Sequence, residues 1–98
     1  MEYQYRRYRI ADGAMAEFLA EWREQIVPLR RRFGFEIVGA WVAEEENAFV
    51  WILCYAGAEG YAARDAEYYG SDERKELDPD PARHLAEVET TIVVPVTT

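Results

Sequence analysis

The segment from Phe35 to Tyr55 constrains the fold of this chain most strongly. It contains two apolar runs of strand length, separated by a short acidic break at residues 44–47. β-Branched and aromatic residues crowd both runs, and such runs on either side of a polar break are typical of a β-hairpin. Neither run alternates cleanly, since Glu36 is the only charged residue in either of them. Near-continuous apolar strands are buried on both faces, so we expect a cover on each side of the hairpin.

Length and charge limit the classes of protein. The 98 residues suffice for a modest core, and we expect one domain over residues 1–98. Seven arginines face five acids up to Gly34 and four basic residues face fourteen acids after it, which gives the net charge of −8. An acidic chain without a basic stripe is repelled by phosphate groups, so we expect neither nucleic acid nor a membrane as partner. The single cysteine, Cys54, has no partner for an internal disulfide, which favours a cytoplasmic location.

Two amphipathic helices are expected on either side of the hairpin. Apolar residues recur at helical spacing over Asp12–Phe33, where Asp12 is a suitable N-cap and Gly34 a suitable C′ residue. Pro28 removes one backbone hydrogen bond of this helix, so a kink or break is expected there. Glu59–Tyr69 has the pattern of the second helix.

Two further strands are expected at the ends of the chain. Glu2–Ile10 carries tyrosines and arginines on both of its faces. His84–Val96 gives the last strand, and Pro95 places it at a sheet edge because proline cannot donate to a central ladder. The order β-α-β-β-α-β predicts a ferredoxin-like α+β fold, a four-stranded antiparallel sheet with both main helices on one face.

The same pattern predicts a homodimer. Two helices cover only one face of such a sheet, yet the hairpin and the run Ile92–Val94 are apolar on both faces. An uncovered face would expose contiguous apolar surface on the order of several hundred Å², more than soluble monomers usually tolerate. We therefore expect a second copy to pack sheet to sheet about a two-fold axis.

Three stretches of the chain carry a resemblance to a known family. They are the opening Tyr3-Gln4-Tyr5-Arg6-Arg7-Tyr8, the helix start at Gly13 with Phe18 and Trp22 downstream, and the hairpin residues Gly39-Ala40-Trp41, Asn47, Val50-Trp51 and Tyr55. These patterns resemble the NIPSNAP family of the dimeric α/β-barrel superfamily over residues 3–69. The chain departs from the family at Gln4, where relatives usually carry Glu.

The resemblance implies a homodimer with a small-molecule cleft between each sheet and its helices. The wider superfamily includes cofactor-independent oxygenases, isomerases, dehydratases and haem-dependent enzymes, whereas the NIPSNAP branch is mostly of unknown biochemical role. It therefore implies an assembly and a cleft, and leaves the substrate and the reaction open.

Candidate catalytic residues lie mainly on the first strand. Arg6 can hold a carboxylate or enolate oxygen, and Tyr8 or Tyr55 can relay a proton. The alternative is that Arg6 forms an ion pair with Glu36 or Glu89 across the sheet or the dimer interface.

His84 is the only histidine of the chain. It can serve as a general base or a haem ligand, but its position directly after the loop 78–83 favours an exposed strand start. No Cys or His pair stands at ligand spacing, so we expect no metal site and no tightly bound cofactor.

Aromatic residues supply the candidate ligand-binding set. Such residues line pockets for flat, apolar compounds, although many are simply core; the set is Trp22, Trp41, Trp51, Tyr68 and Tyr69. The first hypothesis is a homodimer that binds an apolar aromatic or polyketide-like small molecule. If it is an enzyme, we expect a cofactor-independent oxygenase, isomerase or cyclase acting on that compound. The alternative is a non-catalytic scaffold module, and a cavity between the helices and the sheet would distinguish the two.

Overall fold

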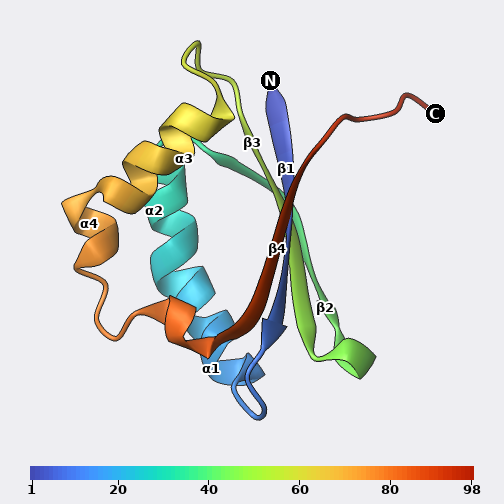
Figure 1. The fold of residues 1–98 in the computed structure, drawn as a ribbon, viewed down its shortest axis with the longest axis vertical. Coiled ribbons are helices and arrows are strands. Elements are labelled where there is room, and N and C mark those ends of the chain that lie inside the picture. The colour runs from blue at the N-terminus through green and yellow to red at the C-terminus, as the bar shows by residue number, and fades with distance from the viewer.

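The computed structural model has a four-stranded antiparallel sheet with its helices on one side (Figure 1). The elements are β1 (Glu2–Ile10), α1 (Met15–Glu21), the π-helical segment η1 (Trp22–Ile26), α2 (Val27–Arg32), β2 (Glu36–Ala43), the 3₁₀ turn η2 (Glu44–Glu46), β3 (Ala48–Tyr55), α3 (Tyr61–Gly70), α4 (Asp72–Lys75), the 3₁₀ turn η3 (Pro81–His84) and β4 (Leu85–Val93). The strand order is β2-β3-β1-β4, with all pairs antiparallel. This is the predicted ferredoxin-like arrangement, which is confirmed.

The central strand β1 decides which residues face the helices. Arg6 pairs with Trp51 of β3 on one side and with Thr90 of β4 on the other. Since paired residues share a face of the sheet, these three side chains point the same way. Residues of even number on β1 therefore lie on the covered face, and Arg6, Tyr8 and Ile10 are all buried.

The first helical region runs without interruption from Met15 to Arg32 but changes its hydrogen-bond pattern in the middle. In η1 the backbone N–H of Val27 donates to the Trp22 carbonyl, five residues back. The irregularity expected at Pro28 thus takes the form of a π-helical segment, a common way to accommodate such a position. Gly34 has φ +89°, as its predicted C′ role requires.

Several predicted boundaries are corrected by the structure. Asp12 is not the N-cap, because α1 begins after Ala14 and has no side-chain cap. The second helix is Tyr61–Gly70 rather than 59–69. The last strand begins at Leu85 because Pro81–His84 forms a 3₁₀ turn, and it ends at Val93, two residues before Pro95. The predicted edge position of this strand is confirmed.

The core lies between the covered face of the sheet and the helices, and the opposite face carries no element of this chain (Figure 1). Eleven buried side chains form the core: Tyr8, Ile10, Phe18, Ile26, Leu29, Phe35, Phe49, Trp51, Leu53, Tyr61 and Tyr68. On the uncovered face Trp41 is 55% exposed, whereas Val50 and Ile52 are only half-buried. None of the helices combines the length and the apolar composition that a membrane-spanning helix needs.

Candidate functional site

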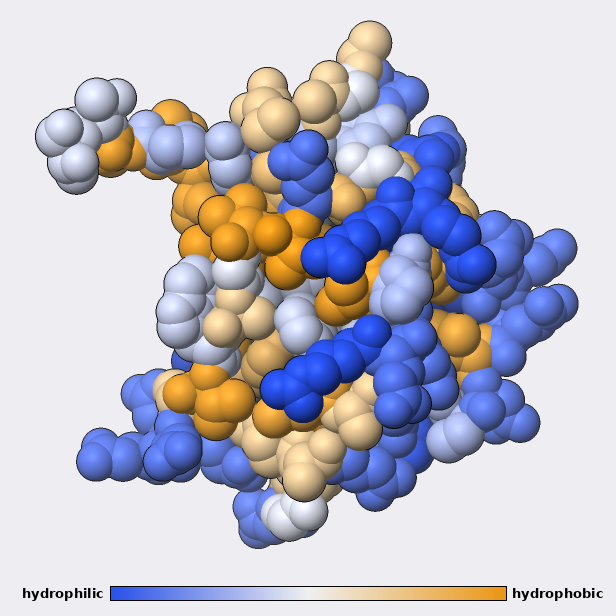
Figure 2. Space-filling view, turned by 180° about the vertical axis from the view of Figure 1, so that it is seen from behind, coloured by the Kyte–Doolittle hydropathy of each residue, from blue (hydrophilic) through white to orange (hydrophobic).

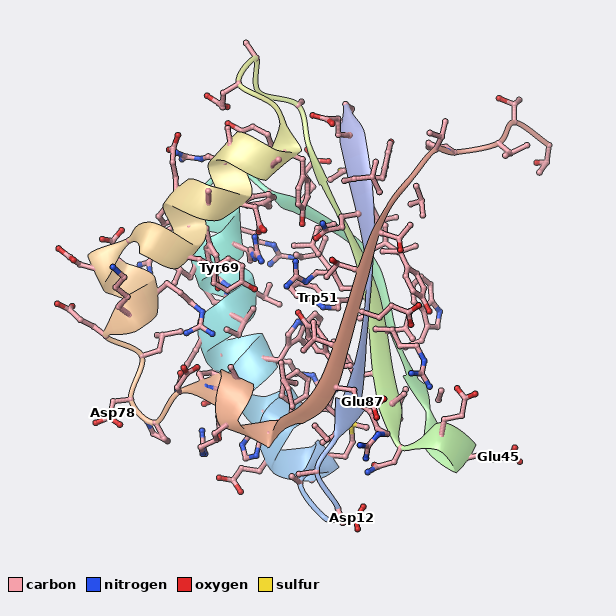
Figure 3. All side chains as sticks on the ribbon, viewed as in Figure 1. Asp12, Glu45, Trp51, Tyr69, Asp78 and Glu87 are labelled. Carbon is pink, nitrogen blue, oxygen red and sulfur yellow. The ribbon has the colours of Figure 1, made fainter.

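A cavity of about 200 Å³ lies between the covered face of the sheet and the helices. Ten of its fourteen lining residues are hydrophobic, three are arginines and none is acidic. The lining residues are Arg6, Tyr8, Phe18, Trp22, Ile26, Arg30, Trp51, Tyr68, Tyr69, Arg74, Pro81, Ala82, Leu85 and Val88. Figure 3 shows Trp51 and Tyr69 in the space between the sheet and the helices. The deep walls are buried, whereas Tyr69, Ala82 and Val88 are exposed and mark the side toward β4.

Arg6 is the charged group of the sheet side of this cavity and is 5% exposed. Its Nε donates to the Tyr8 hydroxyl at 2.8 Å, one terminal nitrogen donates to Gln4 Oε1 at 2.6 Å and the other to the Tyr69 hydroxyl at 2.8 Å. Gln4 and Tyr8 are its neighbours on the same face of β1, two residues away in each direction. The alternative of an ion pair with Glu36 or Glu89 is not observed within this chain, since all three hydrogen bonds go to neutral oxygens.

Arg30 is the charged group of the helix side and is 1% exposed. One terminal nitrogen donates to Asp65 Oδ1 at 2.6 Å and the other to the Tyr69 hydroxyl at 3.3 Å. Its guanidinium carbon lies 3.8 Å from the centre of the Tyr68 ring, close enough for a cation–π interaction. The aromatic ring and Asp65 together compensate the burial of this charge.

The Tyr69 hydroxyl joins the two arginines, because it accepts from both Arg6 and Arg30. A third arginine, Arg74 of α4, lies with its guanidinium carbon 5.7 Å from the Tyr69 ring centre. Arg74 forms an ion pair with Asp80 at 3.1 Å, and that carboxylate is more than half exposed. Three cations from β1, α2 and α4 therefore surround one phenol.

The buried tyrosines of this region remain protonated at neutral pH. Burial raises the pKa of Tyr8 despite the opposing charge of Arg6. Burial also raises the pKa of Tyr61 and that of Tyr68 to about 12, against the opposing charge of Arg30. The Tyr8 and Tyr68 hydroxyls thus present neutral dipoles to the cavity and do not neutralise the arginines.

A sequence model of the family described as NIPSNAP matches residues 3–98. The chain belongs to the NIPSNAP family. The predicted resemblance is confirmed and extends beyond residue 69 to the C-terminus of the sequence. A comparison with curated protein sequences finds no match.

Solved structures of NIPSNAP proteins have the same fold. An uncharacterized NIPSNAP domain protein from Burkholderia xenovorans is 21% identical, with 98% of this chain and 95% of that chain covered and a TM-score of 0.83. A NIPSNAP family protein with unknown function from Agrobacterium tumefaciens is 23% identical, with 97% and 87% covered and a TM-score of 0.84. An antibiotic biosynthesis monooxygenase is 16% identical, with 99% and 100% covered and a TM-score of 0.71. These similarities show the fold alone.

The cavity of this NIPSNAP protein brings together six of the nine residues singled out from the sequence. They are Arg6, Tyr8, Trp22, Trp51, Tyr68 and Tyr69. Trp22 packs edge to face on Trp51, with ring centres 5.5 Å apart. The remaining three, Trp41, Tyr55 and His84, lie elsewhere.

Trp41 and Tyr55 lie outside the cavity for different reasons. Trp41 pairs with Val50 on the uncovered face of the sheet, where its ring covers Gly39. Tyr55 ends β3, and its hydroxyl donates to the Glu59 carboxylate in the loop before α3. Neither side chain lines the cavity that contains the arginine cluster, Arg6, Arg30 and Arg74.

His84 corrects the expectation of an exposed strand start, because it is only 7% exposed. Its Nε2 lies 3.2 Å from Glu21 Oε2 and 3.9 Å from Glu17 Oε1. The three ligand atoms lie within 4.8 Å of one another, which is close enough to hold a metal ion. Arg83 already donates to both carboxylates at 2.8–2.9 Å, so a metal would have to displace its guanidinium. The arrangement serves as an ion-pair network that fastens η3 to α1.

The sequence reasoning missed Arg30 and Arg74 as cavity residues. Arg30 belongs to a run of three arginines at the end of a helix, where favourable interaction with the helix dipole explains cations without a site. The helical periodicity of the apolar residues could have identified Arg30. It follows Ile26 by four residues, so it lies on the same buried face of the helix. Arg74 carries no such signal, since its burial depends on how α4 folds back over the cavity.

Proposed function

We propose that this NIPSNAP protein is a homodimer in which each subunit binds a small, largely apolar aromatic compound between its helices and its sheet. The cavity is the observation that carries the proposal. Its walls are mainly aromatic and aliphatic, and a few polar groups converge on one side, which is the usual composition of a small-molecule site. Trp22, Trp51 and Tyr55 packed without a void would favour the scaffold alternative. The open space beside Trp22 and Trp51 argues against it, although Tyr55 does not line that space.

The uncovered face of the sheet supports the dimer. Trp41 and Val38 are 55% and 53% exposed there, beside the half-buried Val50 and Ile52. Figure 2 shows hydrophobic residues mostly on the side of the sheet and hydrophilic residues mostly over the helices.

The apolar part of this face comes from β2 and β3, whereas β1 and β4 add the charged Arg7, Arg9 and Glu87. Apolar surface on a sheet face of this kind is best covered by a second copy packed face to face. Sedimentation velocity at micromolar concentration should give a dimer, and a folded monomer under these conditions would contradict this part of the proposal.

Ligand binding is tested with a panel of one-ring aromatic compounds, followed by titration calorimetry. The decisive variant is Val88→Trp, because Val88 lies at the exposed rim of the cavity and a larger side chain there narrows the entrance. Ile92→Trp is the matched control, since Ile92 lies on the same face of β4 but does not line the cavity. Val88→Trp should abolish binding and Ile92→Trp should leave it unchanged. Absence of binding by the native protein across the panel would reject the proposal.

A cofactor-independent oxygenase, isomerase or cyclase step is the second candidate, and the bonded pair of Arg6 and Tyr8 favours it. A fixed guanidinium stabilises negative charge that develops on an enolate oxygen, and an adjacent phenol can pass a proton. Conversion of a bound compound in air, measured by liquid chromatography, would establish turnover. Tyr8→Phe should then lower turnover by about 10²-fold or more while binding is retained. Binding with no conversion would leave the ligand-binding function alone.

A further inference from the structure

The charges around the cavity do not balance. Arg6, Arg30 and Arg74 all line it, whereas only two carboxylates, those of Asp65 and Asp80, form ion pairs with them. Asp80 is largely exposed to solvent, so it compensates its arginine only in part. An excess of at least one positive charge therefore remains in a mostly apolar space.

Arg6 is the guanidinium without a counter-ion. Its three hydrogen bonds go to the amide of Gln4 and to the hydroxyls of Tyr8 and Tyr69. A guanidinium has five N–H donors, so two of them remain for another acceptor. Burial of a charge without an opposite charge is costly, and the natural compensation is a bound anion.

Further donors near the cavity lack a partner. Seven buried polar side-chain atoms have none, and five of these belong to residues that line the cavity. Four of the five are N–H groups, which donate and cannot accept: Trp22 Nε1, Trp51 Nε1, Arg30 Nε and Arg74 Nε. These atoms have almost no accessible surface, so they add donor dipoles to the wall of the cavity and do not contact a ligand directly.

The size of the cavity limits the rest of the molecule. A cavity of about 150 Å³ with apolar walls holds benzene, so the cavity of this protein suits one aromatic ring with a short substituent. The Trp22 and Trp51 rings offer apolar surface for such a ring, close to the arginine side. Shape and charge thus specify two ends of one molecule.

We propose that the ligand of this cavity is a monocyclic aromatic carboxylate, with its carboxylate against Arg6 and its ring beside Trp22 and Trp51. This inference rests on the proposed ligand-binding function and adds the charge of the ligand. If the inference holds, the protein binds an acid more tightly than an uncharged compound of the same shape. The cavity itself would accept either.

The experiment compares two acid–amide pairs on the full-length native protein by titration calorimetry. Benzoate is measured against benzamide, and phenylacetate against phenylacetamide, at neutral pH and fixed ionic strength. At least one acid should bind about tenfold or more tightly than its amide, the minimum expected for a charge-assisted hydrogen bond in place of a neutral one.

Arg6→Met then tests the residue, with Arg7→Met as the matched control. Arg7 is the next residue of the same strand, lies on the opposite face and pairs with the exposed Glu46. Arg6→Met should remove the preference for the acid, and Arg7→Met should retain it. The comparison of acid with amide in the native protein does not depend on whether Arg6→Met folds.

Two outcomes overturn the inference and are distinguishable. Equal affinity for acid and amide in both pairs would reject the anionic ligand and leave the proposed binding of aromatic compounds intact. No binding by any of the four compounds would reject the inference together with the proposed function. A preference for the acid that survives in a folded Arg6→Met would also reject the assigned contact.

Discussion

The Nε of Arg6 donates a hydrogen bond of 2.8 Å to the hydroxyl of Tyr8, two residues along the same face of β1. Both side chains are 5% exposed. The bond fixes the guanidinium against the sheet, so that its terminal nitrogens extend to Gln4 and to Tyr69 of α3. A pair of residues on one strand therefore supplies the fixed part of the site, and the helices supply the rest.

Tyr8→Phe should destabilise the protein by about 1–3 kcal/mol, because it leaves the buried Arg6 Nε without an acceptor. Urea denaturation followed by circular dichroism measures the free energy of unfolding. Tyr5→Phe is the control, since Tyr5 is half-buried on the other face and forms no side-chain hydrogen bond; its effect should stay within about 0.5 kcal/mol. Equal effects of the two substitutions would show that the bond contributes nothing.

Asp65→Asn should cost about 3 kcal/mol, because it removes the charge that compensates the buried Arg30. The amide keeps the shape of the carboxylate, so the change tests charge rather than packing. Glu67→Gln serves as the comparison: it breaks the solvent-exposed pair with Arg64 and should cost less than about 1 kcal/mol. If Asp65→Asn were as mild as Glu67→Gln, the ring of Tyr68 alone would suffice for Arg30.

Acid should weaken the contact between η3 and α1. The hydrogen bond from Arg83, with a further one from His84, lowers the pKa of Glu21 below its ordinary value. The folded state therefore binds fewer protons at this group, so the stabilisation is present above the unfolded pKa of about 4.3 and is lost as the pH falls through the lower folded value.

Glu21→Gln should accordingly be less stable than the native protein at neutral pH and should lose less stability on acidification. The free energy of unfolding at about pH 6 and about pH 3 measures this difference. Glu24→Gln on the exposed side of the same helical region should follow the native profile. A parallel acid profile for native protein and Glu21→Gln would exclude Glu21 as a source of the pH dependence.

Trp41→Lys should shift the proposed dimer toward monomer, because it places a charge on the apolar uncovered face. Val42→Lys is the neighbouring control, since Val42 pairs with Phe49 on the helix side and is 40% exposed. Sedimentation equilibrium should give at least a tenfold weaker association for Trp41→Lys, about 1.4 kcal/mol, and little change for Val42→Lys. Unchanged association of both variants would place any dimer contact elsewhere.

The sequence alone determined the main helices and strands, their order along the chain, and which residues of β1 share a face. Period-two alternation puts Arg6 and Tyr8 on one side of a strand, and this relation holds whatever packs above them. The apolar hairpin, the helical stripe and Pro95 are likewise local signals, and they led to the correct fold class and to the edge position of β4. Element ends were less well determined, as at Asp12 and His84, because caps and 3₁₀ turns depend on neighbouring elements.

The tertiary structure decided which side chains meet. Arg6 and Tyr69 are 63 residues apart, and their contact depends on the packing of α3 over the sheet. A register shift between Ile37 and Gly39 determines the face on which Trp41 lies. Regular alternation would place Trp41 on the same face as Ile37, four residues before it, but the shift moves Trp41 to the uncovered face. Alternation is a property of one strand, whereas a bulge and a helix rotation arise from packing between segments. For that reason the sequence singled out only Arg6 among the three arginines of the cavity, and the fold alone brought Arg30 and Arg74 to it.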